Sequence, residues 1–259
     1  MSTANIVPGF PLTGVSPDSI SFFKRLITWP SSVPSNPRET LYANLIDGLK
    51  TAGIALDCLF VFAAADFMTC CVDLVSNRVA NWPLGFGVFT ADQGVSPQGS
   101  SAYLDLMFNP STDGVNFQRD NASCFFWLLG TQNTPTNVLG NTSGILAVTL
   151  SVNAGHLNWK MNDHADGGIA GNDAGAGSIT DGFYLLNRPS SSATALYENG
   201  SQVAAVSQAS AEIPNGKPNL SSNNQFTVAI LGFGASLPGD QITTLCNLCQ
   251  TYLHAIGAV

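Results

Sequence analysis

A long stretch of the chain, residues 161–182, gathers side chains that could hold a cation. It carries four aspartates and one histidine among glycines: Asp163, His164, Asp166, Asp173 and Asp181. Clustered carboxylate and carbonyl oxygens on a flexible loop suit calcium, so Asp163, Asp166 and Asp173 are the candidate calcium ligands. The alternative is a solvated loop whose acidic residues keep it soluble. Loops of this length are often functional, which keeps both interpretations open.

Trp159, just before this loop, offers an aromatic ring. A sugar bound beside a cation could stack on such a ring. The sequence therefore predicts one candidate ligand-binding site with calcium as its optional cofactor. Its residues are Trp159, Asp163, His164, Asp166 and Asp173.

Two common hydrolytic arrangements are missing from the sequence. A glycosidase on a sandwich fold would place paired carboxylates on one strand through a Glu-x-Asp-x-x-Glu pattern. The three glutamates, Glu39, Glu198 and Glu212, are too far apart to form that pattern. The chain also lacks a Gly-x-Ser-x-Gly nucleophile elbow, and His254 falls in a predicted helix. We therefore expect a protein that is not an enzyme.

The six cysteines favour a structural interpretation. Cys246 and Cys249 form a CxxC motif, but a zinc site needs a second, suitably spaced pair, and Cys70 and Cys71 are adjacent. The first residues do not show the basic and then apolar pattern of a secretory signal peptide, so we expect reduced thiols. All six cysteines lie in apolar stretches, where a thiol serves as a small core side chain.

The composition argues against two classes of partner. The net charge is −8, and charged residues make up 10% of the chain, compared with about 25% in typical soluble domains. Without a basic patch, neither nucleic acid nor an anionic membrane surface is an expected partner. The longest apolar run, residues 54–65, is interrupted by Asp57 and is too short to insert across a bilayer. A surface with so few charges suits packing against other subunits.

Strands dominate the middle of the chain. Asn199-Gly200 lies between two apolar segments and predicts a tight hairpin turn, because both residues tolerate positive φ. Candidate strands are the segments 85–90, 101–108, 122–130, 144–152, 156–162, 182–187, 194–199, 201–207 and 225–234. Most are short, rich in β-branched or aromatic residues, and bounded by turn residues. This spacing predicts a mainly β protein: a two-sheet antiparallel sandwich of the jelly-roll type.

Helices are expected on both sides of these strands. Residues 1–36 form a Pro-rich arm with one amphipathic piece, and the arm could dock on its own domain or on a neighbour. Asn36-Pro37 opens a helix that ends near Gly53, and a buried strand and a short helix from Asp66 follow it. We expect segment 37–80 to pack on a sandwich formed by 81–259, which ends in a helix closed by Gly257.

Several blocks of the sequence occur in an order that resembles a known family. They are LDCLFVFAA, FTADQGVSPQGSSAYLDLMFNPST, ASCFFW, DGFYLLNRPSSSATALYENG, IPNG and GFGASLPGDQITTLCNLCQTYL. Over about residues 38–256 the chain is similar to the concanavalin A-like (laminin-G-like) jelly-roll structural proteins of tailed bacteriophages and prophages. None of these blocks is a catalytic signature.

This resemblance implies a non-enzymatic virion protein, assembled in the bacterial host cytoplasm: a capsid decoration, neck or tail-associated subunit. Its partners would be other virion proteins, contacted through the arm, and a symmetric homo-oligomer such as a trimer would follow local virion symmetry. The alternative is a carbohydrate-binding adhesin or receptor-binding tail protein that recognises host surface glycans through the predicted loop.

Overall fold

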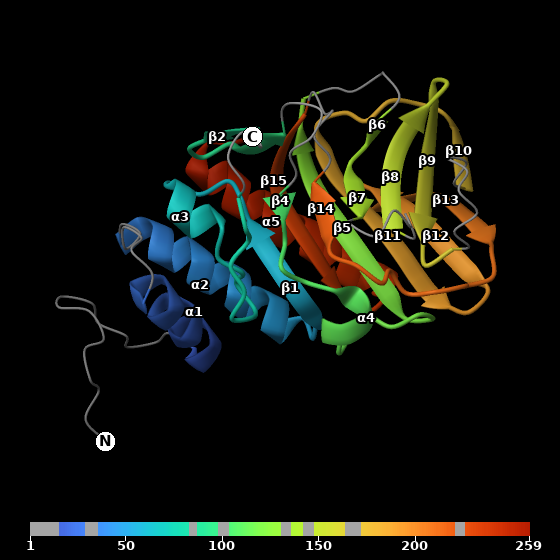
Figure 1. The fold of residues 1–259 in the computed structure, drawn as a ribbon. Helices are drawn as coiled ribbons and strands as arrows, with labels where there is room; N and C mark the ends of the chain where they lie inside the picture. The colour runs from blue at the N-terminus through green and yellow to red at the C-terminus, as the bar shows by residue number, and fades with distance from the viewer. Residues whose placement is uncertain are drawn as a thin grey trace.

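The chain folds into three layers: helices, a large sheet, and two smaller sheets. The computed structural model describes residues 16–28, 36–82, 87–97, 104–130, 136–141, 148–163, 172–220 and 226–259. In Figure 1, α1 and α2 lie on one side of the molecule, and the strands β8 and β9 lie on the other. The mainly β, antiparallel sandwich with flanking helices is thus confirmed.

The large sheet has eight strands, all paired antiparallel. Its order is β13 (Ser201–Ser207), β12 (Ala193–Glu198), β11 (Gly182–Ser190), β5 (Ala122–Leu129), β15 (Thr227–Gly234), β3 (Gly94–Pro97) and β2 (Gly87–Thr90), and β1 (Leu56–Val61) also pairs with β15. Segment 37–80 therefore contributes a strand to the sandwich as well as a helix that covers it.

Two smaller sheets form the third layer. The four-stranded sheet, called the small sheet below, has the order β10 (Asn172–Ala176), β9 (His156–Met161), β8 (Val148–Asn153) and β6 (Thr136–Asn137). The three-stranded sheet has the order β4 (Leu104–Asp105), β14 (Pro218–Leu220) and β7 (Leu139–Asn141). β3, β6, β7, β10 and β14 were not among the predicted strands.

The strand predicted over 101–108 is much shorter in the structure. Residues 101–103 lie outside the described residues, and β4 ends at Asp105. The Asp105 carboxylate accepts a hydrogen bond from the Met107 backbone N–H at 2.7 Å, and Met107 has a φ of 53°. This local Asx turn, which the apolar alternation did not show, ends the strand.

The described helices are α1 (Pro17–Thr28), α2 (Asn36–Thr51), α3 (Phe67–Cys70), α4 (Pro110–Asp113) and α5 (Gly239–Ile256). Asp66, which the sequence placed near the start of a short helix, caps α3 by accepting from Thr69 N–H. Gly53 (φ 67°) and Gly257 (φ 76°) end α2 and α5 in the left-handed conformation. None of the described helices is both long and apolar enough to cross a bilayer.

Apolar side chains cover both faces of the large sheet. β5 illustrates this, because Cys124 and Phe126 face the smaller sheets whereas Phe125 and Trp127 face the helices. Burying side chains of this size contributes roughly 1.5–3 kcal/mol each. The helix-side core includes Phe22 of α1, so α1 packs on its own chain. All six cysteines are buried free thiols, as the sequence predicted.

Candidate functional site

The structure places Asp163 in an internal ion pair. Asp163 follows β9, and its carboxylate pairs with the guanidinium of Arg188 in β11, whose side chain is fully buried. Asn172 donates to the second carboxylate oxygen at 2.7 Å. Burial raises the pKa of Asp163, and the charge of Arg188 opposes that shift. Asp163 therefore holds β9, β10 and β11 together and is not an open cation ligand.

Trp159 and Asp173 lie on opposite faces of the small sheet. Trp159 is paired with Asn172 in register, faces the core, and is 0% exposed. Asp173, the next residue of β10, is paired with Asn158 and therefore faces outward. The position of Trp159 does not match the expected stacking platform, because a buried indole has no free face for a sugar.

The sequence predicted a calcium site from Asp163, Asp166 and Asp173. The two of these that the structure describes, Asp163 and Asp173, do not converge on one point. Asp163 faces Arg188, whereas Asp173 pairs with His156 Nδ1 at 3.0 Å. The backbone N–H of Gly175 and then His156 hold the pKa of Asp173 below its usual value. His164 and Asp166 lie outside the described residues. Within the described ranges, no cluster of three His, Cys, Asp or Glu residues could hold a metal.

The outer face of the small sheet carries a polar row in register. Asn137, Ser151, Asn158 and Asp173 are directly opposite one another across β6, β8, β9 and β10. Ser151 is 2% exposed and Asn158 is 6% exposed. Ser151 Oγ has no hydrogen-bond partner among the described residues. The row is polar but closed at its centre, so it is not an accessible ligand surface in this structure.

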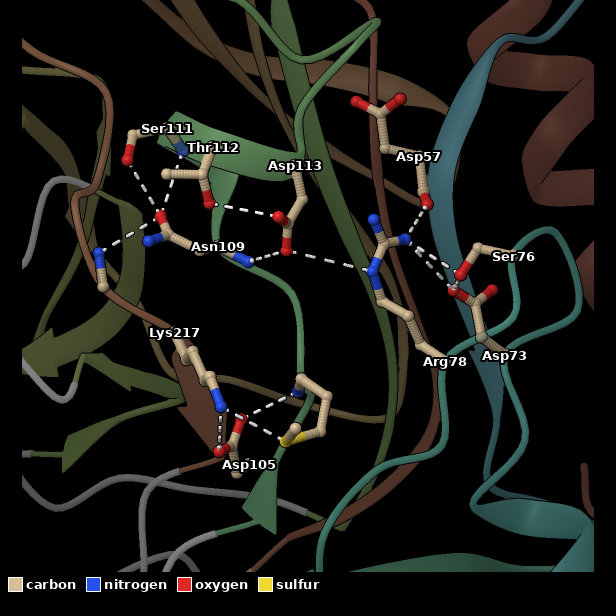
Figure 2. Close-up of polar contacts among 12 residues, drawn as sticks. Asp57, Asp73, Ser76, Arg78, Asp105, Asn109, Ser111, Thr112, Asp113 and Lys217 are labelled. Carbon is tan, nitrogen blue, oxygen red and sulfur yellow. Dashed lines mark hydrogen bonds and ion pairs between the residues drawn. The ribbon is translucent and has the colours of Figure 1, made fainter.

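A second polar cluster surrounds Arg78, as Figure 2 shows. Arg78 Nη1 donates to the Asp57 backbone oxygen at 2.9 Å and to Ser76 Oγ at 2.8 Å. Its guanidinium also lies 3.7 Å from Asp73 and 4.0 Å from Asp113. Burial raises the pKa of Asp73, and the hydrogen bond from Ser76 opposes that shift. The guanidinium offsets part of the negative charge of the two carboxylates, and its contacts join β1, the 73–78 loop and α4.

The neighbouring polar residues in Figure 2 are also satisfied internally. Asn109 Oδ1 caps α4 by accepting from Ser111 N–H at 3.1 Å, and Asn109 N–H donates to Asp113 at 2.9 Å. Lys217 Nζ bonds to Asp105 at 3.1 Å. The cluster therefore fixes the positions of these loops.

An open groove lies over β12 and β13. Its volume is about 490 Å³, within the range of small-ligand sites. The polar residues that line it are Asn187, Ser192, Thr194, Tyr197, Gln202 and Ser207. The remaining lining residues are alanine, valine and proline, and none of the described lining residues carries a charge.

Tyr197 and Gln202 form the polar feature of this groove. Tyr197 Oη donates to Gln202 Oε1 at 3.1 Å, and the two residues are paired across β12 and β13. Asn187 is held differently, because its amide bonds to both the N–H and the C=O of Leu237 at 3.0 and 2.9 Å. The groove thus offers an aromatic side chain, an amide and hydroxyl groups, the side-chain types that recognise polar rings.

The sequence contained a signal for this groove that was not used. The hairpin around Asn199-Gly200 was predicted, and Asn199 and Gly200 have φ values of 48° and 80°. A two-residue turn places Tyr197 opposite Gln202, because Glu198 pairs with Ser201. The pairing could have been derived from the turn, but the hollow could not, because it depends on small residues of β12 and β13.

No protein-family model and no curated protein matches the chain. Solved structures share its fold. The binding domain of botulinum neurotoxin serotype D has a TM-score of 0.54 at 10% identity, over 74% of this chain and 51% of that one. The ligand-binding domain of that serotype in complex with N-acetylneuraminic acid has a TM-score of 0.52 at 9% identity, over 77% of this chain and 52% of that one.

A sialidase of Trypanosoma rangeli, in complex with a difluoro sugar analogue, has a TM-score of 0.51 at 10% identity, over 83% of this chain and 40% of that one. The chain spans about half the length of the neurotoxin domains and less of the sialidase. At these identities the likeness shows a common lectin-like sandwich fold.

Proposed function

We propose that this chain is a carbohydrate-binding domain with no catalytic activity of its own. The observation that carries the proposal is the open groove of about 490 Å³ over β12 and β13, with Tyr197 and Gln202 hydrogen-bonded at its wall. An aromatic ring packs against the C–H face of a sugar, and amide and hydroxyl groups bond to its hydroxyls.

The fold supports this proposal. One of the similar structures is a ligand-binding domain in complex with N-acetylneuraminic acid, and another is a sialidase with a bound sugar analogue. The absence of an enzymatic role is part of the proposal and rests on the missing carboxylate pair and nucleophile motifs. The three glutamates of the chain lie on different elements, in α2, in β12 and in the segment before β14, and so do not form that carboxylate pattern.

A glycan array probed with the full chain tests the proposal, in calcium and again in EDTA. Saturable binding to a defined set of glycans is the expected result. Calcium independence is expected as well, because the described groove residues include no carboxylate. Failure to bind any glycan in either buffer would refute the proposal.

A phage virion subunit is the second candidate, and the ordered sequence blocks described above favour it. A virion surface is a natural setting for a sugar-binding domain, so the two proposals are compatible. The partners would then be capsid, neck or tail proteins, and the subunit would form a symmetric homo-oligomer. Mass spectrometry of purified virions tests the placement, and absence of the chain from them would refute it.

A further inference from the structure

The polar pair of the groove lies between a tight hairpin turn and a β-bulge in β13. Leu196 pairs with Ala204, but the next residue, Tyr197, pairs with Gln202, so Val203 is the extra residue. The two-residue turn at Asn199-Gly200 pairs Glu198 with Ser201 and therefore Tyr197 with Gln202, so the hydrogen bond of 3.1 Å joins neighbours on one face of the sheet. The bulge lies beyond this pair and shifts the register between β12 and the rest of β13. Bulges are common beside functional sites.

The hydrogen-bonded pair presents complementary groups to a ligand. Tyr197 uses its hydroxyl proton to bond to Gln202 Oε1, which leaves the Tyr197 oxygen as an acceptor and the Gln202 amide NH₂ as a donor. A hydroxyl group both donates and accepts, so it matches this arrangement. A carboxylate only accepts, so it would leave the tyrosine oxygen unmatched.

The groove also lacks any group that could balance a charge. All the described residues that line it are neutral, and the chain as a whole carries a net charge of −8. A partly buried carboxylate, sulfate or phosphate without a cationic partner is costly.

We propose that the groove over β12 and β13 binds an uncharged sugar residue. Its ring packs on Tyr197, and one hydroxyl is held between Tyr197 Oη and the Gln202 amide. This proposal rests on the proposed carbohydrate-binding function and names its ligand class. It separates the chain from the similar ligand-binding domain that was crystallised with N-acetylneuraminic acid, an acidic sugar.

Pairs of glycans that differ only in a terminal N-acetylneuraminic acid provide the test. The full chain is titrated with each member of a pair by calorimetry, at low and at high salt. The neutral member is expected to bind at least about tenfold more tightly, with little change between salt concentrations. Preferential binding of the sialylated member would overturn the neutral ligand class while leaving the carbohydrate-binding function intact.

Variants locate the binding. Tyr197→Ala is expected to weaken neutral-glycan binding about tenfold or more, and Gln202→Ala about three- to tenfold. Tyr197→Phe retains the ring but loses the hydroxyl, so it should resemble Gln202→Ala. Gln202→Glu keeps the acceptor but replaces the donor with a negative charge, and it should weaken binding more than Gln202→Ala does.

Gln250→Ala is the matched control, because Gln250 is an exposed glutamine on α5 outside the groove. It should bind like the unchanged chain, and circular dichroism should show that all variants are folded. Full affinity in Tyr197→Ala and Gln202→Ala would overturn the assignment to this groove, although binding of glycans elsewhere would persist. Absence of any glycan binding would overturn both proposals.

Discussion

Arg188 and Asp163 form a fully interior ion pair between strands β11 and the end of β9, 25 residues apart in sequence. The remaining guanidinium hydrogens donate to backbone oxygens, including Gln208 O at 2.8 Å. One charged pair therefore links the large sheet, the small sheet and the segment after β13. The paired charge and these backbone hydrogen bonds explain how a chain with so few charges keeps an arginine in its core.

Arg188→Met is expected to destabilise the fold by roughly 3–5 kcal/mol, because it leaves the Asp163 carboxylate buried without its partner. Urea denaturation followed by fluorescence measures the change. The double variant Arg188→Met with Asp163→Leu removes both charges and should recover much of the loss. If the single variant proved as stable as the unchanged chain, the pair would not be a structural link.

Arg78 should contribute less than Arg188. Its side chain is 22% exposed, but its guanidinium donates hydrogen bonds to the Asp57 backbone oxygen and Ser76 and lies 3.7 Å from the Asp73 carboxylate. The guanidinium also lies 5.1 Å from the centre of the Phe108 ring. Arg78→Ala is expected to cost about 1–3 kcal/mol of unfolding free energy. Arg119→Ala, which removes an exposed pair with Asp120, serves as the control and should change stability by less than about 1 kcal/mol. Equal effects of the two variants would contradict this account of the cluster.

Glu39 predicts a pH dependence of stability. It is 4% exposed, and burial raises its pKa from the ordinary value of 4.5 to about 7. Because the folded protein holds the proton more tightly than the unfolded chain, this stabilising contribution is complete below the unfolded pKa and is lost as the pH rises through about 7. Glu39→Gln should therefore be more stable than the unchanged chain at alkaline pH.

The expected difference is on the order of 2 kcal/mol at about pH 8.5, and it should disappear below about pH 4. Denaturation curves of both proteins at the two pH values measure it. Glu212→Gln, at an exposed position, should show little difference at either pH. A difference for Glu39→Gln that did not vary with pH would show that Glu39 does not titrate in this range.

The sequence predicted the architecture where its signals are local. Asn199-Gly200, Asp66 and Gly257 each mark a turn or helix end by their own conformational preference, and the structure places those boundaries as expected. β10 was missed because Asn172–Ala176 contains no β-branched or aromatic residue and gains its strand conformation from pairing with β9.

The candidate site was harder to predict because it depends on which face each side chain takes. The alternation of Leu157, Trp159 and Met161 with Asn158 and Lys160 already indicated that Trp159 lies on the apolar face. The pairing of Asp163 with Arg188 carried no comparable signal, because strands far apart in sequence meet only in the folded sandwich. The bulge at Val203 was equally invisible, although it shifts the register between β12 and the rest of β13.

Hydrogen–deuterium exchange of the full chain with a neutral oligosaccharide tests the central claim most directly. The account predicts that bound sugar slows exchange in β12 and β13, around Tyr197 and Gln202, and leaves β9 and β10 unchanged. Tyr197→Ala should abolish that protection. Protection confined to β9, β10 and the loop between them, or none in β12 and β13 at saturating sugar, would contradict the account.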